Sequence, residues 1–267
     1  MSMRALMALG LLVACSGADE TDATDTDTDV ADTDTDTDVV TDELAIQGAF
    51  VDQFFYTYEI DATSWDFYGS GTPGTITSWD NDAGWFVGQN SAKDKYNPDL
   101  WSRVDFVANG EGWLLCQIGF DAKTEADAIA AKPADATDVA KGCNGYPWSE
   151  LRAGIDIVGS YTDDYKLAHE VTLTGWDSYD AGTPCAFSQY DNDAMWAVCQ
   201  NNAKAKYFPS LWSKYQWAYN DADELVYCQT AFNAKDEAEA LSTPMLDTTD
   251  TSKGCGTSPW SILTPTP

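Results

Sequence analysis

The chain has 267 residues and a formal net charge of −30, because 44 Asp and Glu residues are opposed by only 14 Lys and Arg residues. This charge excludes nucleic acids as partners, since nucleic-acid binding needs clustered Lys and Arg, and it disfavours anionic lipid surfaces. The body is acidic in its own right: residues 45–267 hold 13 basic and 32 acidic residues, a net charge of −19.

The N-terminus has the pattern of an export signal. Met1–Arg4 carries one positive charge, and Ala5–Val13 is apolar but far shorter than the about 20 residues of a membrane-spanning helix. The next motif, Leu12-Val13-Ala14-Cys15, resembles the lipobox of bacterial lipoproteins. The resemblance implies a signal peptide of residues 1–14, a lipidated Cys15 that anchors the protein in a membrane, and, because Ser16 follows, the outer membrane as destination. An ordinary signal peptide with a chance cysteine is the alternative.

Residues 15–44 then form a predicted tether. Between Ala18 and Glu43 the chain is mostly Asp and Thr, without Lys, Arg or aromatic residues. Such a segment cannot bury enough surface to offset the entropy of ordering, so we expect disorder. At about 3.3 Å per residue its reach is on the order of 90 Å. A spacer is the main interpretation, and calcium buffering is the alternative.

The body reads as two copies of one unit, residues 45–152 and 153–267. An offset of 111 aligns Trp65-Asp66 with Trp176-Asp177, and it aligns residues 89–102 with residues 200–213. Further on the offset becomes 112. The extra residue falls near Asn109-Gly110, a strong hairpin-turn signal at which insertions are tolerated.

Each unit is predicted to be mainly β. Aromatic and β-branched runs are short and are bounded by Gly, Pro, Asn and Asp. Two Ala- and Glu-rich segments, Thr124–Ala131 and Lys235–Leu241, predict one short helix per unit. The fold class is therefore two tandem small antiparallel β-barrels or β-sandwiches, with the choice between barrel and sandwich left open.

Besides Cys15, six cysteines indicate an oxidising compartment and a disulfide-stapled body. Two pairs have the same spacing of 27 at corresponding places, and one pair remains. Zinc is disfavoured because the chain has no CxxC motif and only one histidine. The predicted disulfides are Cys116–Cys143, Cys228–Cys255 and Cys185–Cys199.

The third disulfide suggests a strand register. Cys185 and Cys199 each lie seven residues from Asn192, so a hairpin centred there would place them opposite each other. In the first unit Gly74 and Gly88 stand at these positions. The same register pairs Ile76 with Phe86 and Thr77 with Trp85.

The turns of these hairpins are candidate cation sites. Each places two carboxylates beside an amide, and such oxygen clusters suit calcium. Asp and Asn also favour tight turns for conformational reasons alone, and this is the stronger interpretation. The candidate ligands are Asp80, Asp82, Asp191 and Asp193.

The same turns suggest a sugar site. Trp79 and Tyr190 abut them, and an exposed aromatic ring beside polar groups suits glycan binding. The pairs Gln89-Asn90 and Gln200-Asn201 are candidates for added polar contacts, or they satisfy backbone groups inside the fold. Tryptophans that match between the units are expected in the core. Matched cations, which could hold an anion or form surface ion pairs, are Lys93, Lys95 and Arg103, and Lys204, Lys206 and Lys214.

Catalysis has little support. His169 is the only histidine and no nucleophile motif accompanies it. The pattern of Trp-Ser, Cys-Gln, and Gly-Cys before Pro-Trp-Ser resembles repeats of bacterial surface proteins, which implies location and architecture only. We therefore expect a membrane-anchored binding or adhesive module, with glycan as the candidate ligand. The alternatives are a structural envelope protein that contacts other proteins and a hydrolase that uses two carboxylates.

Metabolic labelling with a palmitate analogue tests the predicted anchor. The wild-type protein should be labelled, because Cys15 receives acyl chains, and Cys15→Ser should not be labelled. A Cys15→Ser protein that is still labelled would refute lipid attachment at this residue.

Overall fold

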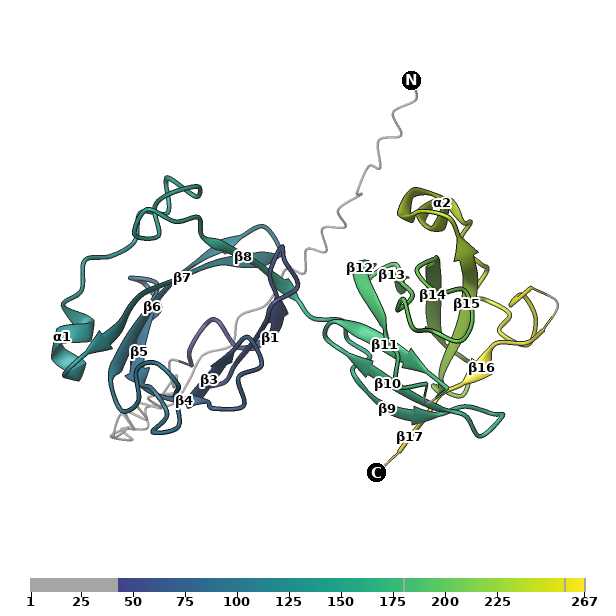
Figure 1. Ribbon diagram of the computed structural model, residues 1–267, viewed down its shortest axis with the longest axis horizontal. Helices are drawn as coiled ribbons and strands as arrows, with labels where there is room; N and C mark the ends of the chain where they lie inside the picture. Colours follow the sequence, from purple (N-terminus) through teal and green to yellow (C-terminus); the bar gives the residue numbers. More distant parts are fainter. Residues whose placement is uncertain (1–42, 180, 257, 267) are drawn as a thin grey trace, which may run out of the picture. The chain divides into compact units, whose positions relative to one another are not determined.

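The computed structural model describes residues 43–179, 181–256 and 258–266. The predicted signal peptide, Cys15 and nearly all of the tether lie outside the described residues. The described chain forms two antiparallel sheets, β1–β8 and β9–β17, with one short helix following the seventh strand of each (Figure 1). The prediction of a mainly β fold is confirmed.

The first sheet is a closed barrel, which decides between barrel and sandwich. Each strand pairs with the next, and β8 returns to β1 with Ala153 opposite Phe50. The strands are β1 (Gly48–Val51), β2 (Thr57–Ile60), β3 (Ser64–Phe67), β4 (Gly74–Asp80), β5 (Trp85–Gln89), β6 (Trp101–Asn109), β7 (Gly112–Ala122) and β8 (Ser149–Ala153).

The second sheet, which we call the second barrel, has the strand order β16-β15-β14-β13-β12-β11-β10-β9-β17. Its last two strands flank Leu263; one pairs with β15 and the other with β9, so this short segment bridges the two ends of the sheet. The strands are β9 (Gly159–Thr162), β10 (Ala168–Thr172), β11 (Gly175–Ser178), β12 (Cys185–Asp191), β13 (Trp196–Gln200), β14 (Trp212–Tyr219), β15 (Leu225–Ala234), β16 (Ser261–Ile262) and β17 (Thr264–Pro265).

The helices are short and capped. Helix α1 (Glu125–Ile129) begins after Thr124, and α2 (Glu237–Ser242) begins after Asp236. Each cap side chain accepts a hydrogen bond from a backbone N–H of the first turn, as N-caps do. Both helices fall within the predicted segments to within one residue.

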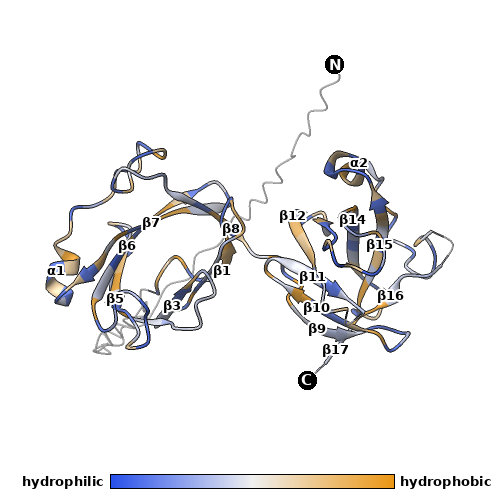
Figure 2. Ribbon diagram, viewed as in Figure 1, coloured by the Kyte–Doolittle hydropathy of each residue, from blue (hydrophilic) through white to orange (hydrophobic). Residues whose placement is uncertain are grey.

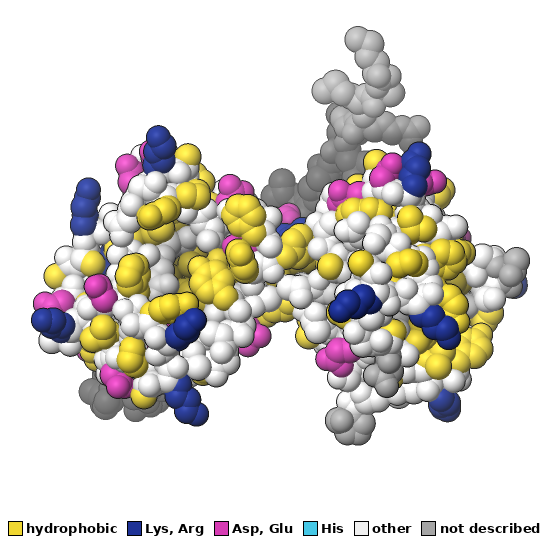
Figure 3. All heavy atoms as spheres, in the orientation of Figure 1, with side chains coloured by type: hydrophobic (Ala, Val, Ile, Leu, Met, Phe, Trp, Pro, Cys, Tyr) yellow, Lys and Arg dark blue, Asp and Glu magenta, His cyan; other side chains and the backbone are white. Residues whose placement is uncertain are grey.

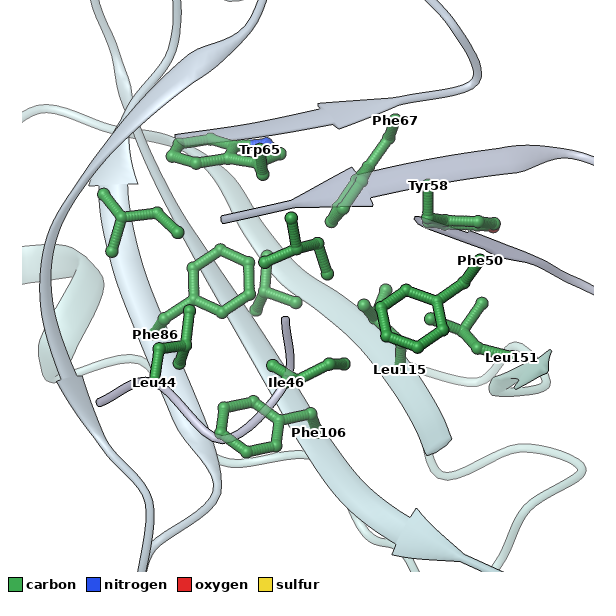
Figure 4. Close-up of a cluster of buried hydrophobic side chains, with 13 residues drawn as sticks. Leu44, Ile46, Phe50, Tyr58, Trp65, Phe67, Phe86, Phe106, Leu115 and Leu151 are labelled. Carbon is green, nitrogen blue, oxygen red and sulfur yellow. The ribbon is translucent and has the colours of Figure 1, made fainter. Parts of the chain in front are cut away.

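Buried hydrophobic side chains fill the interior of each barrel. Buried and exposed residues alternate along β2 and β10, as in a strand with one buried face, and Figure 2 shows hydrophobic and hydrophilic residues in the same strands. The segment that precedes β1 adds Leu44 and Ile46, which are 1% and 0% exposed and lie among the aromatic side chains of the strands (Figure 4). Ile155 and Ile157 hold the aligned positions of the second barrel and are equally buried. Each such aliphatic side chain contributes about 1.5–3 kcal/mol by leaving water.

One asparagine per barrel holds this entering segment. Asn81 donates to the carbonyl of Glu43 at 2.7 Å and accepts from the N–H of Ala45 at 2.9 Å. Asn192 donates to the carbonyl of Gly154 at 2.9 Å and accepts from the N–H of Asp156 at 3.2 Å. The amide therefore completes the backbone hydrogen bonding of a segment that has no strand partner there.

The three predicted disulfides are confirmed, with S–S distances of 1.98, 1.98 and 2.02 Å. The predicted register, however, is wrong. Ile76 pairs with Gly88 and not with Phe86, and Trp85 pairs with Asp80. Two features shift the register: the β4–β5 loop has four residues, 81–84, and a bulge lies between Ile76 and Ser78. The same shifts occur in β12–β13, where Phe187 is opposite Cys199.

The paired glycines of the first barrel make room for a tryptophan. A Cβ added at Gly74 or at Gly88 would lie 2.4 Å from the ring of Trp65. The indole thus lies against both positions at which the second barrel has Cys185 and Cys199. There the aligned Trp176 stacks instead on Tyr215, with ring centroids 4.5 Å apart and an interplanar angle of 16°.

Alanine substitution tests this close packing. Gly88→Ala should lower the free energy of unfolding by about 1–3 kcal/mol, because the new methyl would overlap Trp65 and the carbonyl of Thr75. Gly119→Ala is the matched control, since a Cβ there meets no atom closer than 3.7 Å. Equal urea midpoints for both variants would contradict the packing of Trp65 against Gly88.

Candidate functional site

A pocket of about 630 Å³ opens at one end of the second barrel. Its walls come from the β11–β12 connection, from the β13–β14 loop and from the inner faces of β14 and β15. Because the Asn192 turn joins β12 and β13 at one end, these two connections lie at the opposite end. The pocket and the clamped entering segment are thus at different ends of the barrel.

The floor of the pocket is the stacked pair Trp176 and Tyr215, which are 1% and 3% exposed. The hydroxyl groups of Ser178 and Tyr215 lie 3.0 Å apart. Burial raises the pKa of Tyr215 above its usual range, so the phenol stays protonated and remains available as a hydrogen-bond donor. The floor thus combines two stacked, almost fully buried rings with two hydroxyl groups.

The rim carries exposed aromatic rings. Tyr179, Tyr207 and Phe232 are 46%, 66% and 47% exposed, and the ring of Phe208 lies 5.1 Å from that of Phe232. Hydrophobic side chains are spread over the visible surface in Figure 3. Tyr179 also has a φ of 69°, which is unusual for a bulky residue. These rings could stack on a flat ligand face.

A polar network behind the rim holds these rings in place. The amide nitrogen of Asn201 donates to the carbonyls of Phe208 and Phe232, at 3.0 and 3.3 Å. Its oxygen accepts from Ser213, whose hydroxyl in turn accepts from Gln229 at 3.1 Å. The network joins the β13–β14 loop to β15.

The four predicted polar ligand residues therefore bind backbone. Gln89 and Gln200 donate to the carbonyls of Asp99 and Ser210, at 2.9 and 3.2 Å. Asn90 repeats the bonds of Asn201 in the first barrel. Of the four, the structure places only Asn201 in the wall of the pocket. Their backbone role is the interpretation that the sequence left open beside ligand binding.

The first barrel carries different side chains at inner positions that align with those of the second barrel. Phe67, which is 7% exposed, aligns with Ser178, and Phe86 aligns with Ala197. Val104 aligns with Tyr215. Compared with the first barrel, the second barrel thus has smaller side chains at two inner positions, Ser178 and Ala197, and an aromatic ring at one, Tyr215.

The tyrosines and phenylalanines of the rim are not among the predicted ligand-binding residues. A signal was present in the sequence, since three of the rim positions are aromatic in both units. Their counterparts in the first unit are also exposed, at 59%, 77% and 50%. These counterparts are Tyr68, Tyr96 and Phe120.

The Trp79 and Tyr190 pair lies elsewhere. Both side chains are half-buried and pack against the cores, which differs from the exposed platforms expected from the sequence. Tyr190 donates to the carbonyl of Ala153 at 2.8 Å, and burial raises its pKa to about 12. Both are thus packing residues of the cores.

The Asp-Asn-Asp turns use their first carboxylate as a turn cap. Asp80 accepts from the N–H of Ala83, and Asp191 accepts from the N–H of Ala194, both at 2.8 Å. Asp82 and Asp193 are exposed. Within residues 43–179, 181–256 and 258–266, no group of three or more His, Cys, Asp or Glu residues is arranged to hold a metal. Calcium binding stays a prediction.

The matched cations separate into two kinds. Arg103 is buried and pairs with Asp105 at 2.8 Å, so the expectation of a surface ion pair is wrong for this residue. Lys214 is also buried and donates to the carbonyl of Thr243 at 2.7 Å. The four others are exposed, and two of them, Lys204 and Lys206, line the pocket.

His169 lies behind the floor of the pocket and is 2% exposed. Its Nδ1 accepts from the indole N–H of Trp176 at 3.2 Å. Its Nε2 lies 3.4 Å from a carboxylate oxygen of Asp163 and 3.3 Å from the hydroxyl of Tyr227. Because Nδ1 accepts, the neutral ring carries its proton on Nε2, where Asp163 can accept it. The histidine fixes the orientation of the floor tryptophan.

The chain matches no family model, no curated protein and no solved structure. In the part of the chain that the structure describes, neither helix is long and apolar enough to cross a bilayer. The case for a function therefore comes from the geometry of the pocket.

The buried histidine predicts a pH dependence of stability. Burial lowers the pKa of His169 below 6.5, although Asp163 and Asp177 oppose the shift. Because the folded pKa is the lower one, the unfolded chain binds more protons as the pH falls below 6.5, and the free energy of unfolding falls with it. Wild type should lose more stability between pH 7.5 and 5 than His169→Asn, in which the amide oxygen can replace Nδ1. Equal losses in urea unfolding would contradict this.

Proposed function

We propose that the protein is a glycan-binding module, and that the sugar occupies the pocket of the second barrel. The observation that carries this proposal is the rim of exposed aromatic rings, Tyr179, Tyr207 and Phe232, around a pocket that buried rings close from below. A pyranose ring presents a flat face of C–H groups, and such a face stacks well on an aromatic surface.

The polar groups of the pocket suit sugar hydroxyls. The Ser178 and Tyr215 hydroxyls lie at the floor, and the Gln229 amide lies in the wall. A small number of placed polar groups in a mostly apolar cavity gives orientation and specificity. The volume of about 630 Å³ falls within the range of sites for small ligands, so it accommodates a short stretch of a glycan.

The location of the protein is part of the proposal. The lipobox-like motif at Cys15 and the acidic tether support an exported, lipid-anchored protein, with the outer membrane as its site. Three disulfides fit an oxidising compartment. We further infer that the two barrels are tandem copies, since the Asn81 and Asn192 clamps and the Gln-Asn networks recur at aligned positions.

Glycan-array binding tests the proposal. The wild-type protein should bind a defined set of glycans, and Tyr207→Ala with Phe232→Ala should lower the affinity by about tenfold or more, since two stacking rings are lost. Tyr165→Ala is the control, because this tyrosine is 69% exposed and lies outside the pocket. An array without binding, or an equal loss with Tyr165→Ala, would contradict a glycan site here.

A further inference from the structure

We propose that the ligand of this pocket is an acidic sugar, whose carboxylate or sulfate group is bound by Lys204 and Lys206. The inference rests on the proposed function and specifies its ligand class. Two observations support it: the positive charge of the pocket, and the difference in charge between the β13–β14 loop and the aligned β5–β6 loop.

The pocket has a charge opposite to that of the chain. Two lysines line it, and none of its lining residues in the described part of the chain is acidic. The whole chain has 44 acidic and 14 basic residues, so the pocket is positively charged in a protein that is negatively charged overall. Asp180, which the sequence places between lining residues Tyr179 and Ala181, lies outside the described residues. Counting it still leaves two cations against one anion.

The β13–β14 loop and the aligned β5–β6 loop share most of their backbone arrangement. Asn90 and Asn201 each donate through the backbone N–H to a leucine carbonyl at 2.8 Å. Each asparagine side chain also binds the carbonyl at the aligned loop position, in Asn97 or Phe208. Asp99 and Ser210 have nearly the same positive φ, 59° and 61°. The backbones differ at Phe208, which has a φ of 50°. The difference in charge between the loops is a difference of side chains.

The β13–β14 loop lacks two negative charges that the β5–β6 loop carries. Both loops carry two lysines at aligned positions, but Asp94 is replaced by Ala205 and Asp99 by Ser210. The Asp94 carboxylate accepts from two backbone N–H groups of its own loop, at 2.8 and 2.6 Å. The first loop is therefore neutral and the second carries two positive charges.

Lys206 places its positive charge beside an aromatic ring of the rim. Its ammonium nitrogen lies 5.0 Å from the ring centroid of the rim residue Tyr207. A sugar stacked on that ring would bring an acidic substituent within reach of the ammonium group. The attraction acts at a partly exposed site, so it should weaken as salt is added.

Titration calorimetry on the mature full-length protein tests the inference with two matched pairs of probes. The first pair is oligogalacturonate and its methyl ester, and the second is a heparin oligosaccharide and its desulfated, carboxyl-reduced form. At least one acidic member should bind about tenfold or more tighter than its neutral partner at low salt. Which pair shows the preference distinguishes carboxylate from sulfate.

Variants locate the preference. Lys204→Gln with Lys206→Gln should abolish it, and Ala205→Asp with Ser210→Asp should do the same by restoring the charges of the first loop. Lys93→Gln with Lys95→Gln is the matched control and should leave the preference intact.

Two outcomes would overturn the inference. If the array shows glycan binding but neither acidic probe is preferred over its partner, the acidic ligand is wrong while the proposed function stands. If the preference survives loss of Lys204 and Lys206 but not of Lys93 and Lys95, the anion site lies in the first barrel. An array without any binding would overturn the proposed function as well.

Discussion

A β-barrel of about 100 residues must fill its interior with side chains, and the two barrels meet this constraint differently. In the first barrel, Trp65 lies against two glycines and Phe67 closes the interior beside it. In the second barrel, a disulfide takes the place of the glycine pair, and Trp176 stacks on Tyr215 instead. Ser178 stands where the first barrel has the ring of Phe67, and it lines the pocket that opens at that end of the second barrel.

The features around this opening form one connected arrangement. His169 accepts a hydrogen bond from the floor tryptophan, so the stacked floor has a fixed orientation. Asn201 ties the loop that bears Tyr207 and the two pocket lysines to the end of β15. A rigid aromatic site with a few polar groups at its edge is what pre-organised ligand binding requires. The rest of the barrel, including the clamp by Asn192, holds the strands whose ends carry this site.

Much of the fold could be predicted from the sequence because its signals are local. Short aromatic and β-branched runs between turn residues mark strands, the Ala- and Glu-rich segments mark helices, and the equal cysteine spacings in the two units mark disulfides. The register could not be predicted, since the bulges at Thr77 and Ser188 leave no mark that distinguishes them from ordinary strand residues. The pocket could not be predicted either. It depends on Ser178, Tyr215 and Gln229 together, which are distant in sequence and become neighbours only through the barrel.

Heteronuclear NMR of the ¹⁵N-labelled protein, titrated with the oligosaccharide that binds best on the array, tests the central claim most directly. The indole N–H of Trp176, the side-chain amide of Gln229 and the backbone of residues 201–208 should shift together and saturate at one affinity. Shifts confined to the Asn81 and Asn192 turns, or to residues outside the second barrel, would show that the sugar binds elsewhere and would contradict the account.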